Sequence, residues 1–366
     1  MENLVTQLKT TYSGRKVLVT GNTGFKGSWL TLFLERLGAE VYGIALAPID
    51  GSLYSDFPIL DSAHDFRIDI RSRDPIIEVV QSIKPDLVFH LAGQTLVLES
   101  IDNPSTSFGV NVLGTVHILE SLIASKGVKG CLVTTTDKVY SPKQSAEPFI
   151  ETDELGGALD PYSASKAATE LAIRSMRQLA ELKHESSLQI ISARAGNVIG
   201  GGDNSGNRLI PDLVRSATTG ISVSVRSPAS IRPWQHVLDP IFGYLKCGYF
   251  MLNDVPLSLE FNFGPSPEAF LTVEQLSRKF IDSWVEHDLF KGDVVFAAQN
   301  SSPLETSRLL LNSSKAKREL GWSNILNPDL SIEWIIEWTV KNQELNARER
   351  TLNQIDKYLE FLGQLS

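Results

Sequence analysis

The feature that most constrains the fold is a short apolar run that opens directly into a glycine-rich turn. Residues 16–20 (KVLVT) precede the turn 21–27 (GNTGFKG), and a periodic helical pattern follows from Ser28 to Leu37. Glycines allow tight curvature here and let N–H groups at a helix start approach a pyrophosphate. A plain strand-to-helix turn is the alternative, but the strand and helix on either side favour a dinucleotide site. The residues expected to contact it are Gly21, Thr23, Gly24, Phe25 and Gly27, with Lys26 as an exposed lysine at the loop edge.

Strand-like and helix-like patterns then alternate through the first half of the chain. Further apolar runs lie at 40–46, 64–70, 85–94, 130–136 and 188–194, with helical patterns between them that include 74–83, 104–125 and 161–182. Six such units predict an α/β fold: a doubly wound parallel sheet of Rossmann type, with right-handed crossovers. Ligands of such sheets gather at the carboxyl ends of the strands, where Thr136 and Asn197 fall.

The alternation weakens after Arg194, which indicates a second structural unit. A helix at 239–253 and a strand at 259–264 are expected to return to the main sheet, whereas helices near 272–286 and 331–342 indicate a smaller, interleaved C-terminal lobe over the cleft. We expect residues 1–198 and 238–266 to bind the dinucleotide, and residues 199–237 and 267–366 to form the substrate lobe. The amphipathic segment 346–365 is expected to pack on its own domain, with a subunit contact as the alternative.

Composition excludes several classes of partner. The net charge of −9 argues against a general nucleic-acid or membrane surface, although a local anion site remains compatible with it. Two cysteines are too few for a disulfide framework, and no Cys/His cluster has the spacing of a zinc site. No segment approaches 18 apolar residues, and the N-terminus lacks the pattern of a signal peptide. We therefore expect a soluble cytoplasmic protein without a metal.

Several positions bear on the identity of the dinucleotide. The second strand ends in Ala45-Leu46-Ala47-Pro48, without the acidic residue that usually binds the ribose hydroxyls and without an arginine for a 2′-phosphate, which favours NAD weakly over NADP. Asp69 and Ile70 are placed to flank an adenine ring, but Asp69 is equally suited to cap the turn before the next helix. The other expected cofactor contacts are Leu91, Ala92, Gln94, Asn111, Tyr162 and Lys166.

The stretch from Thr134 to Lys166 carries the groups needed for redox chemistry on an alcohol. Tyr162 and Lys166 are four residues apart at the start of a helix, so both side chains project from one face. A nearby ammonium and the positive ring of an oxidised nicotinamide would lower the pKa of the tyrosine. Such a tyrosine takes the proton of an alcohol while hydride leaves the carbon. A chance Tyr-x-x-x-Lys spacing is the alternative, and the preceding glycine turn and strands argue against it.

These motifs resemble the extended short-chain dehydrogenase/reductase family, and within it the 4,6-dehydratases that act on CDP-sugars. The glycine turn and the Tyr/Lys pair are typical of the whole family, whereas Thr136-Asp137-Lys138 and the loop 232–236 (RPWQH) point to this branch. The resemblance extends through 194–203 and 208–212 to about residue 240, with a weaker match at Glu305 and 320–322. It implies NAD as cofactor and CDP-glucose as substrate, deoxysugar biosynthesis for lipopolysaccharide O-antigen, and a homodimer or higher homo-oligomer.

The resemblance also implies a role for each residue of the central stretch. Tyr162 would deprotonate the C4 hydroxyl, with Thr136 bonded to that oxygen and Lys166 stabilising the phenolate. Lys138, if neutral, would remove the C5 proton, while Asp137, if protonated, would donate to the departing C6 hydroxyl. Adjacent Asp and Lys are charged in water, so this pair requires a dry site, and an ordinary ion pair is the alternative.

Substrate contacts are expected from Asn197, Arg208, Arg232, Trp234 and His236, because arginine suits a diphosphate and tryptophan a sugar or base. Four positions depart from the family pattern: Leu98, Glu99, Asn204 and Leu304. The alternatives are a 4,6-dehydratase for another nucleotide sugar, a nucleotide-sugar 4-epimerase, which has no need of Asp137 and Lys138, and a non-catalytic NAD-sensing protein, which has no need of Tyr162 and Lys166.

Overall fold

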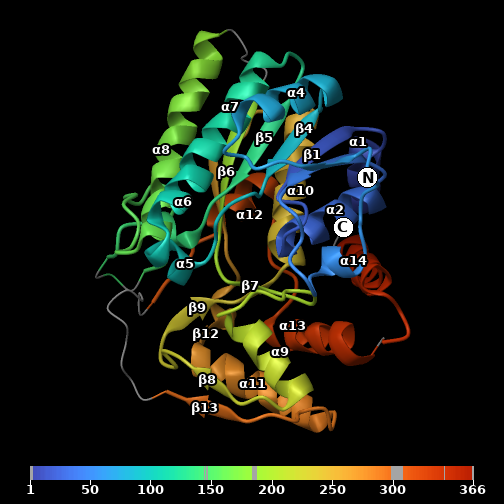
Figure 1. Ribbon diagram of the computed structural model, residues 1–366, viewed down its shortest axis with the longest axis vertical. Helices are drawn as coiled ribbons and strands as arrows, with labels where there is room; N and C mark the ends of the chain where they lie inside the picture. Colours follow the sequence, from blue (N-terminus) through green and yellow to red (C-terminus); the bar gives the residue numbers. More distant parts are fainter. Residues whose placement is uncertain are drawn as a thin grey trace.

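A seven-stranded sheet forms the centre of the protein (Figure 1). The computed structural model describes residues 3–143, 145, 147–183, 188–297, 308–341 and 343–364. The strand order is β11-β6-β5-β4-β1-β2-β3, and every neighbouring pair is parallel, which confirms the predicted doubly wound sheet. The strands are β1 (Lys16–Thr20), β2 (Glu40–Ala45), β3 (Asp65–Arg67), β4 (Leu87–His90), β5 (Gly130–Thr134), β6 (Gln189–Ala195) and β11 (Glu260–Phe263).

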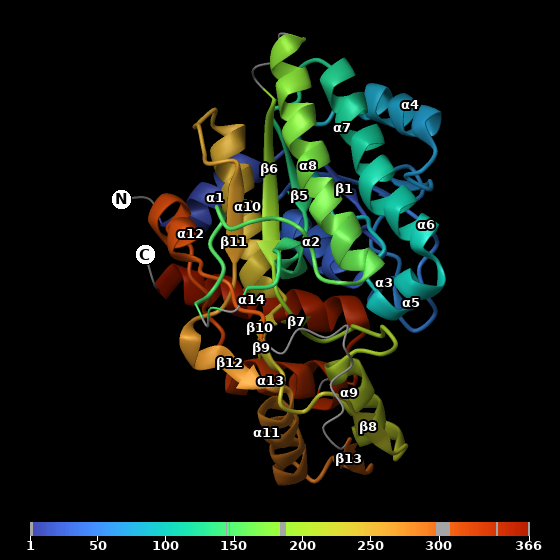
Figure 2. The same cartoon turned by 90° about the vertical axis from the view of Figure 1, so that its left-hand side faces the viewer.

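Helices cover both faces of this sheet, because its strands are apolar on both sides (Figure 2). Alternate residues of β1 pack into different cores: Val17 and Val19 join the first, and Leu18 joins the second. Helices of the first core are α1 (Leu4–Tyr12), α2 (Phe25–Arg36) and α10 (Leu238–Leu252). Those of the second are α4 (Arg73–Ile83), α7 (Thr115–Ala124) and α8 (Pro161–Leu182). The layers therefore hold the carboxyl ends of the strands at one edge.

Some elements differ from the sequence prediction. The third strand ends at Arg67, so Asp69 and Ile70 follow the strand instead of closing it. The helix expected at 104–125 consists of α6 (Pro104–Phe108), a π-helical turn η1 (Gly109–Gly114) and α7. Residues 104–124 are long and apolar enough to cross a membrane, but 56% of the most apolar 18-residue window within them is buried in the protein. The sequence pattern does not predict α1, α3 (Leu53–Asp56) or α5 (Val97–Asp102).

A smaller lobe lies beyond the carboxyl edge of the sheet (Figure 1). Its helices are α9 (Leu209–Thr219), α11 (Val273–Glu286) and α13 (Pro328–Ile336), the last continued by a π-helical turn η4 (Glu337–Lys341). Three strand pairs join it: β7 (Val198–Ile199) with β10 (Gln235–His236), β9 (Ile231–Pro233) with β12 (Phe270–Thr272), and β8 (Val223–Val225) with β13 (Val294–Phe296). There are also two short 3-10 turns, η2 (Asp137–Val139) after β5 and η3 (Pro267–Ala269) before β12. The lobe has its own apolar core, built around Leu213, Phe280 and Trp284.

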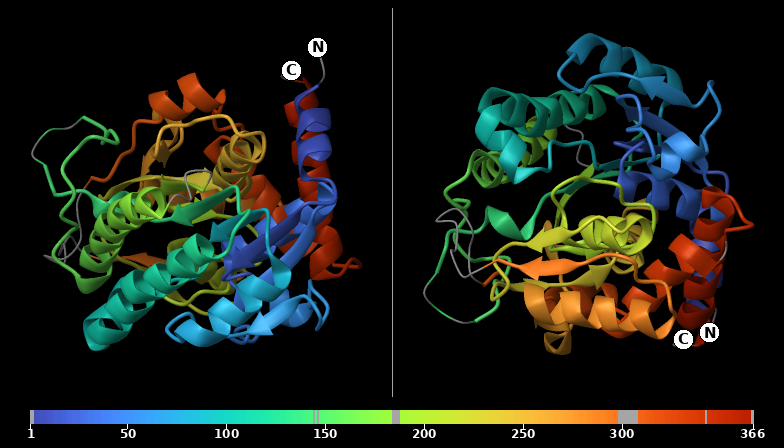
Figure 3. Two further views of the ribbon diagram at one scale, coloured as in Figure 1. Left: turned by 90° about the horizontal axis from the view of Figure 1, so that it is seen from above. Right: turned by 60° about the horizontal axis from the view of Figure 1, so that its bottom comes forward.

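Two helices near the C-terminus, α12 and α14, belong to the sheet layers, although α13 between them belongs to the lobe. Helix α12 (Ser314–Leu320) packs beside β11, and α14 (Ala347–Gln364) packs on α1 and α2, so α1 and α14 lie side by side (Figure 3). The hydroxyl of Tyr358 on α14 donates to the carboxylate of buried Asp239 on α10 (2.9 Å). The residue ranges predicted for the two domains stay a prediction, but α12 and α14 pack with the dinucleotide half.

Candidate active site

A cavity of about 1030 Å³ lies between the carboxyl edge of the sheet and the lobe. Its sheet side is formed by Leu91 after β4, by 134–138 after β5 and by Asn197 after β6. This is the edge at which doubly wound sheets bind ligands. The predicted residues that line the cavity are Leu91, Thr136, Asp137, Lys138, Tyr162, Lys166, Asn197, Arg208, Arg232 and Trp234.

The end of β5 presents the Thr-Asp-Lys triplet to this cavity. Thr136 caps the short turn η2: its hydroxyl accepts a hydrogen bond from the Lys138 N–H (3.3 Å) and donates one to Asp137 Oδ1 (2.9 Å). Among the described residues, Asp137 Oδ2 is buried without a hydrogen-bond partner. Burial raises the pKa of Asp137, although Lys138, Thr136, Arg232 and Lys26 act against it. This is the direction required of an aspartate that donates a proton.

Helix α8 places Tyr162 and Lys166 beside the triplet. Asp160 caps the helix by accepting from the Ser163 N–H (2.9 Å), and the Tyr162 N–H donates to Ser100 Oγ on α5 (3.1 Å). The Lys166 ammonium donates to the carbonyl of Thr134 (3.4 Å), which ties α8 to β5. The first turn of the helix is therefore fixed from three sides.

Burial shifts the pKa values of both groups on this helix. Burial raises the pKa of Tyr162 to about 12, although a hydrogen bond with Thr136 lowers it, and burial lowers the pKa of Lys166 to about 8. The predicted lowering of the tyrosine pKa also needs the positive ring of the bound cofactor, so it stays a prediction. Lys166 donates to a backbone carbonyl here, and a positive ring would have to supply the missing charge.

A buried ion pair behind the triplet holds β5, β6 and α8 together. Arg194 on β6 donates to both carboxylate oxygens of Glu170 on α8, each at 2.9 Å, and both side chains are almost fully buried. Thr135, next to Thr136, donates to the same carboxylate (2.6 Å). Sequence reasoning missed this network. The available signal was Glu170 itself, which lies four residues after Lys166 on one helix face.

The glycine turn fits a dinucleotide pyrophosphate. A Cβ atom on Gly27 would lie 2.0 Å from the Gly21 carbonyl oxygen, and one on Gly21, whose φ is +74°, would lie 2.7 Å from the Ala92 nitrogen. Gly24 caps α2 without a side-chain hydrogen bond. The first N–H groups of α2 are thus left to a bound phosphate.

The other residues predicted to contact the cofactor differ in what they contact in this structure. Thr23 donates its hydroxyl to the Leu46 carbonyl (3.1 Å), beside the end of β2. Asp69 accepts from the Arg71 N–H (2.9 Å) and pairs with the Arg71 guanidinium, so the structure shows the turn-capping alternative. The side chain of Ile70 lies under Gly114 of η1 and is buried.

Asn111 is a positioning group in this structure. Its amide accepts from the Gln94 N–H (2.9 Å) and donates to the Gln94 carbonyl (3.1 Å) and to Ser165 Oγ (2.9 Å). Asn111 thereby fixes the turn after β4, which includes Ala92, against α8. The predicted direct cofactor contacts of Asn111 and Gln94 stay predictions.

The lobe side supplies cations and one aromatic ring, but His236 is not among them. The His236 ring is fully buried between Trp29 and Trp334, with centroids 5.8 and 5.5 Å away. Its Nδ1 accepts from the Leu238 N–H (3.3 Å), and burial lowers its pKa to about 3. The structure thus places the His236 ring in the apolar core, and His236 is not among the residues that line the cavity.

Arg208 crosses from the lobe to the sheet. It donates to Thr95 Oγ1 (3.0 Å), on the loop after β4, and approaches Asp203 Oδ2 (3.5 Å). Arg232 on β9 and Trp234 after it line the same cavity. A guanidinium at the mouth between the two halves is well placed for an anionic ligand.

Comparison with known proteins places this geometry in a family. Residues 17–248 match the model of the NAD dependent epimerase/dehydratase family. The chain belongs to this family. NAD is therefore its cofactor, in agreement with the glycine turn and the absence of an arginine at the end of β2.

Relatives by sequence agree with this membership, and a solved structure agrees with the fold. The chain is 37% identical to CDP-glucose 4,6-dehydratase of Salmonella typhimurium, over 90% of this chain and 92% of that protein. It is 27% identical to a probable dTDP-glucose 4,6-dehydratase of Sinorhizobium fredii, over 89% and 93%. An epimerase structure from Methanothermobacter thermautotrophicus superposes with a TM-score of 0.77 at 24% identity, covering 96% of this chain and 97% of that one.

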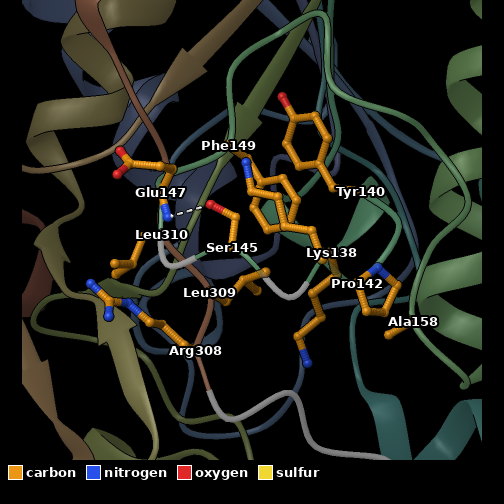
Figure 4. Close-up of a pocket in the computed structure, with 11 residues that line it drawn as sticks. Lys138, Tyr140, Pro142, Ser145, Glu147, Phe149, Ala158, Arg308, Leu309 and Leu310 are labelled. Atoms are coloured by element: carbon orange, nitrogen blue, oxygen red, sulfur yellow. Dashed lines mark hydrogen bonds between the residues drawn. The ribbon is translucent and has the colours of Figure 1, made fainter.

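Lys138 also borders a second, smaller cavity of about 30 Å³ (Figure 4). Its walls come from residues between Tyr140 and Phe149, where Ser145 Oγ accepts from the Glu147 N–H (3.1 Å), and from 308–310. A space of this size holds about one or two waters. Lys138 thus lies between a ligand-sized cavity and a water-sized one.

The described positions that depart from the family pattern lie in the cavity wall and in a contact between two loops. Leu98 and Glu99 line the main cavity from α5, and the Asn204 amide donates to the Asp50 carbonyl (3.2 Å) on the loop after β2. Leu304 and Glu305 lie outside the described residues. Lys26 was expected at an exposed loop edge, but the structure has it half-buried in the cavity wall.

Proposed function

We propose that this protein is an NAD-dependent 4,6-dehydratase that converts CDP-D-glucose into CDP-4-dehydro-6-deoxy-D-glucose and water. The observation that carries the proposal is the meeting of Thr136-Asp137-Lys138 with Tyr162 and Lys166 in one cavity. An oxidation needs only the hydroxyl, phenol and amine of this set. The extra carboxyl and amine supply the acid and base that loss of water requires. The similarity to the Salmonella CDP-glucose enzyme supports the choice of substrate.

The first half of the reaction is oxidation at C4. Bound NAD supplies the hydride acceptor for C4 and, once reduced, the hydride donor for C6. Tyr162 takes the C4 hydroxyl proton, and the Thr136 hydroxyl holds the same oxygen. Because burial is the main cause that raises the pKa of Tyr162 to about 12, its phenolate depends on positive charge close to the ring. Lys166, on the same helix face, provides part of that charge.

The second half is loss of water across C5 and C6. A ketone at C4 acidifies the C5 proton, and Lys138 removes it. Asp137 gives its proton to the C6 hydroxyl, which leaves as water. Burial raises the pKa of Asp137, and this favours the protonated carboxyl that the step needs. Lys138 exchanges its proton with solvent and then protonates C5 as hydride reaches C6. Before the next turnover, Tyr162 releases its proton to solvent and Asp137 regains one from solvent.

The lobe residues are proposed to bind the nucleotide diphosphate. Arg208 and Arg232 face the cavity from the N-terminus of α9 and from β9, and Asn197 lies between them and the sheet. Two guanidinium groups suit a diphosphate because each can form paired hydrogen bonds with phosphate oxygens. Trp234 is proposed to pack against the sugar or the base.

We further propose a cytoplasmic homodimer that is formed through α6–η1–α7 and α8. Both helices carry large apolar side chains in the open, with Leu113 49% and Leu171 59% exposed. Pairing these faces with a second copy would remove that surface from water. Light scattering with Leu171→Glu tests it, since a charged side chain in the interface should shift the mass from dimer to monomer.

A substrate panel tests the function. The purified protein with NAD is incubated with CDP-glucose, dTDP-glucose and UDP-glucose, and products are followed by alkaline absorbance and proton NMR. We expect a 4-keto-6-deoxy product from CDP-glucose, with deuterium at C5 when the solvent is D₂O. A reaction with another nucleotide sugar alone would overturn the CDP assignment. Formation of a C4 epimer would favour the epimerase alternative, and absence of label at C5 would overturn the elimination.

A further inference from the structure

Lys26 is a cation of the cavity that the reaction described above does not use. It lies within the glycine motif 21–27, in the first turn of α2, and its side chain lines the cavity together with Asp137. In the sheet, β4 separates β1 from β5, and Leu91 after β4 lines the cavity between the two positions. The cavity wall thus runs from the cofactor turn to the catalytic triplet.

Lys26 and Asp137 affect each other electrostatically. The charge of Lys26 is among the effects that lower the pKa of Asp137, and Asp137 in turn raises the pKa of Lys26. Burial, followed by repulsion from Arg208 and Lys166, brings the pKa of Lys26 to about 8. Within the described chain, Asp137 Oδ2 has no hydrogen-bond partner, so this oxygen depends on nearby charge for compensation.

We propose that Lys26 is a positioning residue for the dehydration step, whose ammonium group acts on Asp137 from the cofactor side of the cavity, in addition to Lys138 and Arg232. The inference rests on the proposed function, in which Asp137 donates to the leaving hydroxyl. The charged and titratable groups that interact electrostatically with Asp137 are Lys26 on α2, Lys138 on η2, Tyr162 on α8 and Arg232 on β9, while Lys166 on α8 and Arg208 at the start of α9 line the same cavity.

The sign of the effect follows from the charges. An ammonium favours the carboxylate, so Lys26 holds the pKa of Asp137 below the value that burial alone would give. Without Lys26, Asp137 would remain protonated to higher pH. The alkaline limb of the dehydration rate, where a protonated acid is lost, would therefore move upward in pH.

Carboxyl NMR on the NAD-loaded enzyme tests this directly. Aspartate is labelled with ¹³C at the carboxyl, and Asp137→Asn assigns the signal. Lys26→Met should raise the titration midpoint of Asp137 by about 0.5 to 1 pH unit, whereas Lys26→Arg, which keeps the charge, should restore it. Lys129→Met removes one positive charge at a surface ion pair with Asp254 and should leave the midpoint unchanged. Lys26→Gln replaces the methionine variant if that one does not fold.

The outcomes separate this inference from its alternatives. An unchanged midpoint in Lys26→Met, with weaker NAD binding by calorimetry, would make Lys26 a phosphate ligand and overturn the proposal. An upward shift that the arginine variant reverses supports it, and the alkaline limb of kcat should move by the same amount. If the midpoint moves but the wild-type protein dehydrates no nucleotide sugar, the coupling stands and the proposed function fails.

Discussion

The two walls of the cavity are built differently. On the sheet wall, the reacting groups sit on β5 and α8, which a buried ion pair, a helix cap and the Lys166–Thr134 hydrogen bond hold in place. On the lobe wall, Arg208 stands at the start of a helix, and it pairs with Asp203 at a long distance and with an exposed threonine. The fixed wall suits chemistry that needs well-defined distances. The looser wall suits recognition of a ligand that must enter and leave.

The largest effect is expected from a substitution that removes the buried ion pair of the fixed sheet wall. Arg194→Met leaves Glu170 buried without its cation, which should cost about 3–5 kcal/mol of unfolding free energy. Urea unfolding followed by circular dichroism measures this. Asp356→Asn removes an exposed ion pair with Arg36 and should change the stability by less than about 1 kcal/mol. Equal losses in both variants would contradict the special role of the buried pair.

Removing the phenol tests the chemistry on that wall. Tyr162→Phe should lower kcat by about a thousandfold, because general base catalysis typically contributes a factor of this order. Stopped-flow absorbance of reduced cofactor and steady-state product formation should fall together. The control is Tyr249→Phe on α10, which should retain the wild-type rate. A Tyr162→Phe enzyme within about tenfold of wild type would rule out the phenol as base.

The third prediction separates the two halves of the reaction. Asp137→Asn should slow release of water by about a hundredfold, since it removes the acid but keeps the shape of the side chain. Oxidation at C4 does not need this acid, so rapid quenching should reveal an accumulated 4-keto intermediate with its C6 hydroxyl intact. An equal loss in oxidation and dehydration would instead assign Asp137 to the first step.

The smallest effect is expected on the lobe. Arg208→Gln should raise KM for the nucleotide sugar about tenfold while kcat stays within about threefold, because a phosphate interaction that stabilises the ground state and the transition state equally affects mainly KM. Arg215→Gln, further along α9 and outside the cavity lining, should leave KM unchanged. A large fall in kcat for Arg208→Gln would mean that the lobe also positions the reacting carbon.

The fixed wall could be predicted from the sequence better than the lobe, for a physical reason. The glycine turn, the β5 triplet and the Tyr/Lys pair are local patterns, and α8 begins and ends at the predicted residues 161 and 182. His236 could not be placed in this way, because its burial depends on Trp29 and Trp334, far from it in sequence. The half-buried position of Lys26 likewise depends on packing across three strands. The short strands β8, β9 and β13 are too brief to show a period.

The π-helical turn at Gly109–Gly114 lies inside the continuous helix formed by α6, η1 and α7, and it limits how the number of residues in that helix can change during evolution. A residue in an α-helix rotates about 100° relative to its neighbour. Deleting one residue here would allow regular α-helical bonding, but it would turn α7 away from the sheet or turn the Asn111 amide away from Gln94 and Ser165. Descendants of this protein should therefore tolerate substitutions along this helix far more readily than a change of a single codon in its length.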